Sequence, residues 1–444
     1  MKKTKINTVA IEPAETTEQT EAPYKLPEGW KWCRLGEFID IFRGVSYKKA
    51  DAHSEKLEND CLILRGGNIS EGAIDINADN VYVDKSLVAE NQFIKKNDVV
   101  IVTSTGSTKV IGRAGVSYSD YDDVAFGTFL TLARPNSKAD KYFVDQYFQS
   151  SIYRDRIREL ASGVNINNIR MEYIKDSPIP LPPTIEEQRR IVKRIESLFE
   201  KLDAAKEKAQ NVLDSFETRK AAILHKAFSG ELTANWRKQN GVPDDSWEEK
   251  LFDSCIKKMQ NGLSKRFGEE GKEIVVLRLA NLGETNFDIS DLRTIKLTEK
   301  ERENYILHTN DVVMIRVNGS KSNVARQILV TSNDSWSFCD HIIRIVYESF
   351  CLPNYMVYFS YTKKYKDYIF ENMVSSAGQN TISRKGLANL EIPIPTLPEQ
   401  QEIVRILDNI LQKEQKAKQA AQTVLEQIGL LKKSILDRAF RGEL

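Results

Sequence analysis

Basic and amide side chains gather in turns of two separate regions of the chain. Arg can pair with guanine and Asn or Gln with adenine in the DNA major groove, whereas Lys and Ser suit phosphates. The candidate DNA contacts of the first region are Arg43, Lys48, Lys49, Arg65, Ser107, Lys109, Arg113, Asn165, Asn167, Asn168 and Arg170. Those of the second region are Lys265, Arg266, Arg278, Ser320, Lys321, Arg326, Gln379, Asn380, Arg384 and Lys385. Taken singly, each is typical of a solvated surface; as paired clusters they indicate a nucleic-acid interface. Because the net charge is only +1, such an interface must be a local patch.

The motifs that catalysis on DNA requires are missing from the sequence. It contains no G-x-x-x-x-G-K-[ST] loop for a nucleoside triphosphate and no G-x-G-x-x-G. It also lacks the Asn-Pro-Pro-Tyr or Asn-Pro-Pro-Phe tetrapeptide of adenine methyltransferases. Pro243-Asp244 with Glu248 and Lys250 is similar to a nuclease pattern, but the two parts are too close to occupy neighbouring strands. We therefore expect a chain without catalytic residues.

Cysteine, histidine and hydropathy patterns favour an ordinary reduced protein without a metal site. The cysteines form no C-x-x-C pair, and the four histidines have no metal-ligand spacing. No stretch approaches the roughly 18 apolar residues of a membrane span, and the start has no signal-peptide run. We expect a cytoplasmic protein with no membrane contact and no metal.

The sequence contains an internal repeat of two copies. IPLPPTIEEQRRIV at 179–192 matches IPIPTLPEQQEIV at 392–404, and AILHKAFSGEL at 222–232 matches SILDRAFRGEL at 434–444. Upstream, LRGGNI at 64–69 faces LRLANL at 277–282, and KNDVVIVTSTGS at 96–107 faces TNDVVMIRVNGS at 309–320. The helical parts stay alike while the globular parts diverge, which predicts a duplicated module with two different binding surfaces.

Each copy ends in a long helix with an apolar stripe in steps of four and three residues. The first stripe includes Ile195, Leu198, Leu202, Ala205, Ala209 and Val212, and the second includes Leu407, Ile410, Ala417, Ala421 and Val424. Arg219 interrupts the first stripe, and Glu414 lies in the second. This pattern is typical of a coiled-coil seam. Each helix would be roughly 65 Å long, and antiparallel pairing would place the globular domains at opposite ends. The alternative is that each helix packs only on its own domain.

Short apolar runs such as CLILRGG, NDVVIVTSTG and EIVVLRL predict strands, and YFVDQYFQSSIYRDRIREL and NYMVYFSYTKKYKDYIFENM predict helices. The fold class is therefore α+β, with two mixed α/β domains, two long similar helices and an internal pseudo-two-fold repeat. The expected boundaries are a disordered tail at 1–24, domains at 25–184 and 233–396, and helices at 185–232 and 397–444.

Two divergent domains, each ending in I-P-x-P, E-Q and Ile-Val before a helix that closes on A-F-x-G-E-L, resemble type I restriction-modification specificity subunits over essentially the whole chain. The resemblance implies that each variable domain is a target-recognition domain and that the helices form an antiparallel coiled coil. It assigns the domain-to-helix junctions to Pro180, Pro182, Glu187, Gln188, Pro393, Pro395, Glu399 and Gln400. LPEGW and GVNINNIR also fit the family, whereas the second domain departs at the latter and reads GQNTISRK.

The same resemblance implies the partners. They are double-stranded DNA, two methyltransferase subunits that use S-adenosylmethionine, and restriction and translocation subunits that use ATP and magnesium. The chain itself needs no cofactor and would read a bipartite, asymmetric target, one half-site per domain. The rival interpretations are a coiled-coil scaffold whose globular ends bind proteins, and a fused methyltransferase-endonuclease with a degenerate site.

Overall fold

The computed structural model describes residues 24–163, 168–332 and 334–444. Nearly all of the expected tail at 1–24 lies outside these ranges, as do the predicted DNA contacts Asn165 and Asn167. The chain divides into two compact units. Unit 1 is Met1–Lys208 with Val424–Leu444, and unit 2 is Ala209–Thr423.

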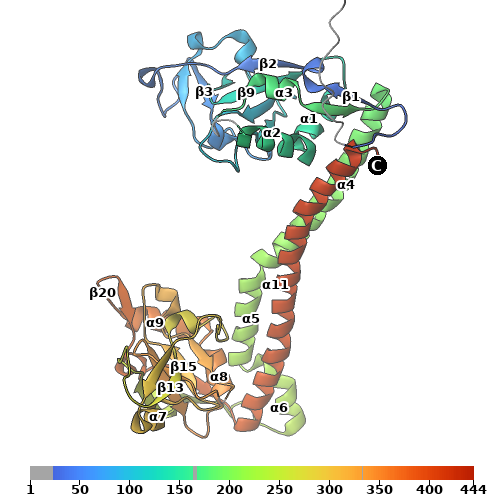
Figure 1. The fold of residues 1–444 in the computed structure, drawn as a ribbon. Helices are drawn as coiled ribbons and strands as arrows, with labels where there is room; N and C mark the ends of the chain where they lie inside the picture. Colours follow the sequence, from blue (N-terminus) through green and yellow to red (C-terminus); the bar gives the residue numbers. More distant parts are fainter. Residues whose placement is uncertain (1–23, 164–167, 333) are drawn as a thin grey trace, which may run out of the picture. The chain divides into compact units, whose positions relative to one another are not determined.

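Unit 1 is built on a five-stranded sheet (Figure 1). Its strand order is β2 (Ile39–Arg43), β9 (Leu130–Pro135), β6 (Val99–Val102), β7 (Ala114–Val116) and β4 (Gly72–Ala73). A second sheet has the order β5 (Tyr82–Asp84), β3 (Asp60–Leu64) and β8 (Val124–Phe126), and β1 (Lys31–Arg34) pairs with β10 (Pro178–Leu181). Every residue of β3 and β6 is buried, and apart from Asp60 both strands are apolar without alternation, as expected for strands covered on both faces.

The helices of unit 1 pack on this sheet, and α1 also contacts the C-terminal part of the chain. They are α1 (Lys141–Gln149), α2 (Ser151–Gly163) and α3 (Met171–Lys175). Phe143 and Tyr147 of α1 share one core cluster with Val99 of β6 and with Phe440, near the C-terminus. The ring of Phe440 lies 5.0 Å from that of Phe143 and 5.7 Å from that of Tyr147. The last turns of the chain are therefore part of the core of the first domain.

Unit 2 contains a four-stranded sheet in the order β12 (Ile256–Asn261), β19 (Ile342–Tyr347), β15 (Val312–Ile315) and β17 (Gln327–Leu329). A three-stranded sheet has the order β14 (Thr294–Leu297), β13 (Lys272–Leu277) and β18 (Ser337–Phe338). A second three-stranded sheet has the order β16 (Val317–Asn318), β21 (Gln379–Thr381) and β20 (Val374–Ser376). In addition, β11 (Glu248–Leu251) pairs with β22 (Glu391–Ile394). Its shorter helices are α6 (Ala234–Asn240), α7 (Glu299–Tyr305), α8 (Pro353–Phe359), α9 (Lys363–Asn372) and α10 (Arg384–Leu387). The mixed α and β composition expected for both globular regions is confirmed.

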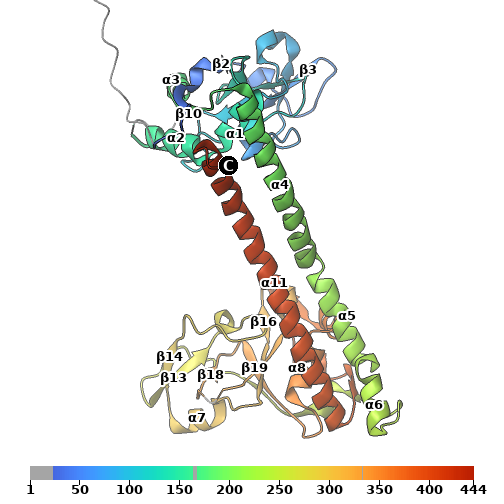
Figure 2. The same ribbon diagram turned by 90° about the vertical axis from the view of Figure 1, so that its right-hand side faces the viewer.

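The long helices differ from one another. The second predicted helix is continuous as α11 (Leu397–Phe440), whereas the first is divided into α4 (Ile185–Asp214) and α5 (Phe216–Phe228) (Figure 2). The break falls at Ser215, whose hydroxyl donates to the carbonyl of Asn211 at 2.5 Å. Serine side chains that bond back to the preceding turn bend helices. The expectation of one unbroken helix over 185–232 is thus corrected by a polar residue that periodicity alone did not single out.

The paired helices run in opposite directions within each unit. In unit 1, Arg190 donates to the carbonyl of Leu444 at 2.9 Å, and Asp203 pairs with Lys432 at 2.6 Å. As residue numbers rise along α4, they fall along α11.

In unit 2, Arg219 pairs with Glu414 at 2.8 Å, and the Thr233 hydroxyl donates to the Glu399 carboxylate at 2.7 Å. Numbers again rise along α5 while they fall along α11. Both units therefore contain antiparallel helix contacts.

The predicted seam positions differ in exposure. Ile195, Ala209, Leu407 and Ala421 are buried, and Leu198, Leu202, Ala205, Val212 and Ile410 are half-buried. Ala417 and Val424 are exposed. The seam assignment as a whole stays a prediction, with its best support at the buried positions.

Glutamines fix each domain to its helix at the predicted junctions. The side-chain oxygen of Gln188, which is 2% exposed, accepts from the backbone N–H of Asp140 at 2.7 Å. The side-chain oxygen of Gln400, fully buried, accepts from the backbone N–H of Leu352 at 2.7 Å. A buried amide that completes a backbone hydrogen bond is costly to replace, because its partner would be left unsatisfied.

Candidate nucleic-acid interface

One arginine occupies the same loop in each domain. Arg65 follows β3 and its guanidinium pairs with Asp79 at 3.0 Å. Arg278 follows β13 and pairs with Asp291 at 2.8 Å. Each arginine is therefore held by a carboxylate of its own domain, which fixes its direction but also neutralises part of its charge.

Arg113 and Arg326 are half-buried and donate hydrogen bonds to backbone carbonyls of neighbouring loops. Arg113 donates to the carbonyl of Ile69 at 3.1 Å, and Arg326 donates to the carbonyl of Leu282 at 2.8 Å. Burial lowers the pKa of the Arg326 guanidinium. These contacts give both residues a structural role, and the DNA contacts expected for them stay a prediction.

A shallow groove of about 520 Å³ in the first domain collects three of the predicted DNA contacts. They are Arg43 at the end of β2, Asn168, and Arg170 at the start of α3. The groove is also lined by hydroxyl groups, among them that of Ser104. An open groove with guanidinium, amide and hydroxyl groups has the donors that base edges and phosphates accept.

The remaining candidates of the first domain lie apart from this groove. Lys48, Lys49 and Lys109 are exposed, and Ser107 is half-buried. Solvated lysines suit phosphate contacts better than base reading.

Several candidates of the second domain are engaged in contacts of their own. The Lys265 ammonium lies 2.9 Å from the Glu301 carboxylate and holds the pKa of that carboxyl below its usual range. Arg384 pairs with Asp253 at 2.6 Å and lowers the pKa of that carboxyl. Such surface pairs contribute at most about 1 kcal/mol each, so a phosphate could replace the carboxylate at little cost.

The β20–β21 hairpin holds two further candidates in different surroundings. Asn380 is buried, and its amide donates to the carbonyls of Asn318 at 3.2 Å and Gly319 at 2.9 Å. Gln379 is exposed at the start of β21. Only Gln379 presents its side chain to solvent. Ser320, Lys321 and Lys385 are likewise exposed.

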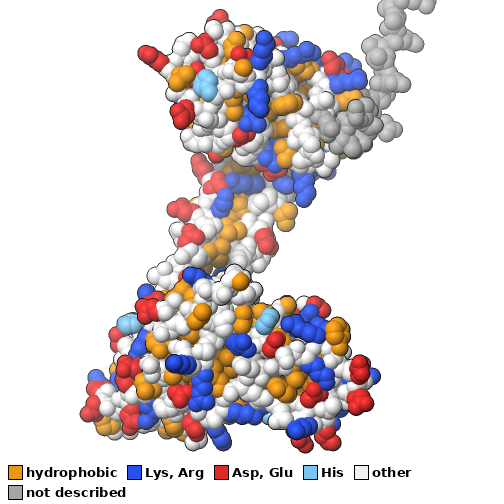
Figure 3. Space-filling model, turned by 90° about the vertical axis from the view of Figure 1, so that its left-hand side faces the viewer, with side chains coloured by type: hydrophobic (Ala, Val, Ile, Leu, Met, Phe, Trp, Pro, Cys, Tyr) orange, Lys and Arg blue, Asp and Glu red, His pale blue; other side chains and the backbone are white. Residues whose placement is uncertain are grey.

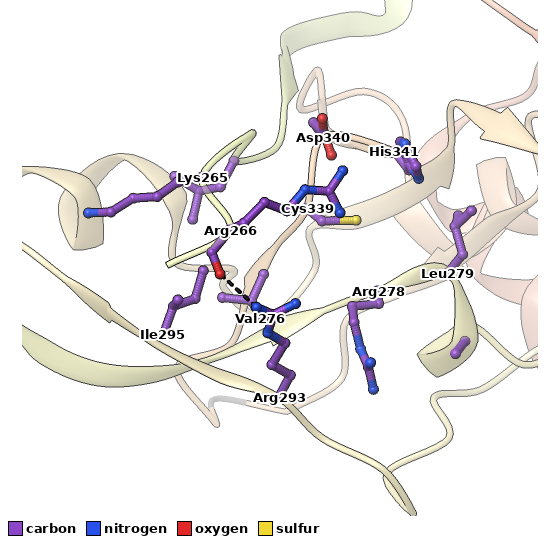
Figure 4. A pocket seen from close by; sticks show the side chains of 12 residues that line it. Lys265, Arg266, Val276, Arg278, Leu279, Arg293, Ile295, Cys339, Asp340 and His341 are labelled. Carbon is purple, nitrogen blue, oxygen red and sulfur yellow. Dashed lines mark hydrogen bonds between the residues drawn. The ribbon is translucent and has the colours of Figure 1, made fainter. Parts of the chain in front are cut away.

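A cavity of about 200 Å³ in the second domain brings Lys265, Arg266 and Arg278 together with a turn that sequence reasoning missed (Figure 4). The turn is Cys339-Asp340-His341, between β18 and β19. The internal repeat could have revealed this turn. Asp340 and His341 lie 212 positions after Thr128 and Phe129, and each of these two pairs directly precedes a strand, β19 and β9 respectively.

Potential ligand atoms of Cys339, Asp340 and His341 all lie within 4.8 Å of one another. On the face drawn in Figure 3, Lys and Arg side chains form small groups separated by Asp and Glu. The charge pattern is therefore local in that view, as the near-zero net charge led us to expect.

Comparison with known proteins identifies the family. A family model described as the type I restriction modification DNA specificity domain matches residues 27–214 and 263–427. The StySPI specificity subunit of Salmonella potsdam is 34% identical over 95% of this chain and 90% of its own length. The EcoKI specificity subunit of Escherichia coli K12 is 30% identical over the same shares.

Solved structures share the fold. One of them is described as the structural basis underlying complex assembly and conformational transition of the type I R-M system. It has a TM-score of 0.69 at 20% identity, and the match covers 95% of this chain and 100% of that chain. The HsdS subunit from Thermoanaerobacter tengcongensis has a TM-score of 0.62 at 21% identity and covers 96% and 100%.

The fold and the matched regions define a DNA specificity module of a restriction-modification system. The chain belongs to the type I restriction-modification specificity subunits. Such a subunit is the non-catalytic component of its system, so the expectation of a chain without catalytic residues is confirmed. None of the helices in the described ranges combines the length and apolar character that a bilayer crossing needs.

Proposed function

We propose that this chain reads a bipartite, asymmetric site on double-stranded DNA, with one half-site per globular domain. The groove of the first domain, which joins Arg43, Asn168 and Arg170, is the observation that carries the proposal. The cavity of the second domain gathers a different set of side chains. Because different side chains face the DNA in the two domains, the two half-sites should differ in sequence.

Matched strand pairings support the interpretation that the two domains are copies of one module. Val45 bridges Gly127 in parallel, and Leu263 bridges Cys339 in parallel. In the same way β3 pairs with β8 and β13 with β18, both in parallel. The frame is alike, and the loops that it carries differ.

We further propose that the antiparallel helices act as a coiled coil that sets the spacing between the half-sites. A spacer of about 6 to 8 base pairs spans roughly 20 to 27 Å at 3.4 Å per pair, well within a helix of about 65 Å. The surplus length would serve contacts with partner subunits. Support comes from the antiparallel ion pairs Asp203–Lys432 and Arg219–Glu414.

The partners that we propose are two methyltransferase subunits using S-adenosylmethionine, joined by restriction and translocation subunits using ATP and magnesium. The chain itself would supply DNA recognition and no cofactor site. The work of such a complex on chromosomal DNA fits a cytoplasmic protein.

A domain exchange tests the proposed function. Replacing residues 243–392 by the equivalent domain of a relative should change one half-site of the methylated motif and leave the other half and the spacer intact. A motif altered in both halves, or a single continuous palindrome in the parent, would refute the modular interpretation.

A scaffold whose globular ends bind proteins is the alternative function. A gel shift of the chain with its methyltransferase partner, on target and random duplexes, separates the two. Equal affinity for both duplexes at physiological salt would favour the scaffold.

A further inference from the structure

The loop after β12 and the turn before β19 are locked together in the second domain. Leu263 donates its backbone N–H to the carbonyl of Phe338 at 2.9 Å, and Asp340 donates its own to the carbonyl of Leu263 at 2.9 Å. A Cβ at Gly262 would lie 2.2 Å from the carbonyl oxygen of Cys339, so a larger residue there would push the two segments apart. The backbones of the two segments therefore keep a fixed mutual position at Leu263 and Asp340.

Within the cavity, the side chains of Arg266 and Asp340 make neither an ion pair nor a hydrogen bond in the described ranges, whereas Arg293, which also lacks an ion pair, uses its guanidinium in a backbone hydrogen bond. Lys265 and Arg278 are tied to carboxylates and point away from the turn, whereas the Arg266 guanidinium points toward it (Figure 4). The Arg293 guanidinium donates to the backbone carbonyl of Arg266 at 2.7 Å and holds that segment in place. Over the described ranges, no ion pair or hydrogen bond engages the Arg266 guanidinium or the Asp340 carboxylate. Arg266 is exposed and Asp340 half-buried.

A bound metal ion is the competing use of this turn, because Cys339, Asp340 and His341 could each offer a ligand atom. The surroundings oppose it. Two cationic side chains without an ion pair, those of Arg266 and Arg293, line the same cavity, together with Lys265 and Arg278, which are paired with carboxylates. Burial also raises the pKa of the Cys339 thiol, whereas zinc binds the thiolate. An electropositive cavity with one carboxylate suits DNA better than a divalent cation.

We propose that Arg266 and Asp340 together read one G·C base pair in the half-site of the second domain. Arg266 donates to O6 and N7 of guanine, and Asp340 accepts from the N4 amino group of cytosine. These atoms lie side by side on the major-groove edge of a G·C pair, so two side chains of opposite charge on hydrogen-bonded backbone segments match them. The inference rests on the proposed DNA-reading function and names the chemistry of one of its contacts.

The first domain gives independent support, because the equivalent turn carries different chemistry. Its residues are Thr128 and Phe129, which are exposed, and the turn is locked to its neighbouring loop in the same way. A Cβ at Gly44 would lie 2.1 Å from the carbonyl oxygen of Gly127. The two domains share the backbone pairing that holds this turn, but the side chains on the turn differ. Such a difference is expected at positions that make the two half-sites differ.

The test uses the full complex of this chain with its methyltransferase partners. Arg266→Ala, Arg266→Gln and Asp340→Ala are compared with the wild type by mapping methylated motifs and by competition binding to duplexes that vary each position of the target. Lys300→Ala is the matched control, because Lys300 is an exposed cation on α7, outside the cavity lining. Assembly and thermal unfolding of each complex confirm that it is folded.

We expect a wild-type requirement for G·C at one position of one half-site. Arg266→Ala and Asp340→Ala should lower discrimination at that position by about 5- to 150-fold and leave the other half-site and the spacer unchanged. Arg266→Gln should lower the preference for guanine at that position, because Gln pairs with adenine, while the Asp340 carboxylate still disfavours the O4 acceptor of thymine. Lys300→Ala should match the wild type.

Three results would overturn the inference. Uniformly weaker binding to all duplexes would make Arg266 a phosphate contact, and unchanged specificity in every variant would remove both residues from the interface. Stoichiometric zinc in the purified chain, lost in Asp340→Ala, would make the turn a metal site. A wild-type complex that discriminates no duplex would instead refute the proposed function itself, before any variant is compared.

Discussion

Arg219 of α5 and Glu414 of α11 form an ion pair with a nitrogen–oxygen distance of 2.8 Å. Each is the polar residue that breaks the apolar stripe of its own helix. The arginine also donates to the Ser215 hydroxyl and to the carbonyl of Val212, where α4 gives way to α5. Polar pairs inside a helix seam fix the register at a cost in stability. The pair thus aligns the two helices at the point where one of them bends.

Charge reversal tests this pair. Arg219→Glu should place two carboxylates together and lower the free energy of unfolding, whereas Arg219→Glu with Glu414→Arg should recover part of the loss. The coupling between the positions should be about 0.5 to 1 kcal/mol, since both side chains keep some solvent contact. Urea unfolding of the wild type, Arg219→Glu, Glu414→Arg and the double variant measures this coupling. If the stability losses of the two single variants simply add in the double variant, the pair contributes nothing.

The buried small residues of the seam give a second prediction. Ala209→Glu with Ala421→Glu should impair assembly with methyltransferase subunits, because both alanines are buried and a carboxylate there would lose its hydration. Ala417→Glu is the control, since Ala417 is exposed. Size-exclusion chromatography of the reconstituted complexes reports assembly, and circular dichroism reports the fold. Wild-type assembly of the double variant would place the seam elsewhere.

Helix length should set the spacer of the DNA target. Deleting residues 204–207 of α4 with 428–431 of α11 removes opposing turns beside the Asp203–Lys432 pair. The loss of about 6 Å of helix should shorten the spacer by roughly two base pairs, at 1.5 Å per residue and 3.4 Å per pair, or abolish methylation. Methylome mapping decides the matter. Altered half-sites, or an unchanged spacer, would contradict the role of the helices.

Asp145 on α1 should make the stability of the first domain depend on pH. Burial raises the pKa of its carboxyl to about 8, and the Asn97 amide donates to it at 3.0 Å. Because the folded-state pKa lies above the unfolded value, the stabilisation is fully present below about pH 4 and is lost as the pH rises to about 8.

Asp145→Asn should therefore flatten the fall in stability between pH 5 and pH 8.5. Denaturant midpoints of the two chains across that range measure it, and groups that titrate alike in both cancel in the comparison. Identical pH profiles would mean that Asp145 is charged in the folded protein.

Local pattern predicted much of the fold. CLILRGG and EIVVLRL became β3 and β13, and NYMVYFSYTKKYKDYIFENM became α8 and α9. Periodicity also located the helices, but it missed the break at Ser215 because a serine on the helix surface leaves the apolar spacing unchanged. Such a bend depends on one side chain and its local hydrogen bond, which hydrophobic period does not encode.

The candidate site was harder to predict, because ion pairing depends on residues far away in sequence. Lys265 and Arg384 look like free cations in the sequence, yet their partners Glu301 and Asp253 reach them only through the fold. Asp340 was overlooked for the opposite reason, since an acidic residue is not sought on a DNA surface. Residue type indicates which chemistry is available, and the fold decides which groups remain free to use it.

The packing of Phe440 against Phe143 has a consequence for biosynthesis. Domains generally fold in the order in which they leave the ribosome, at about 5 to 20 residues per second. Here the first domain, which ends near residue 184, must wait for roughly 260 further residues, about 13 to 50 seconds at those rates, before Phe440 can join its core. A stop codon shortly before the codon of Phe440 would accordingly damage the domain that is translated first.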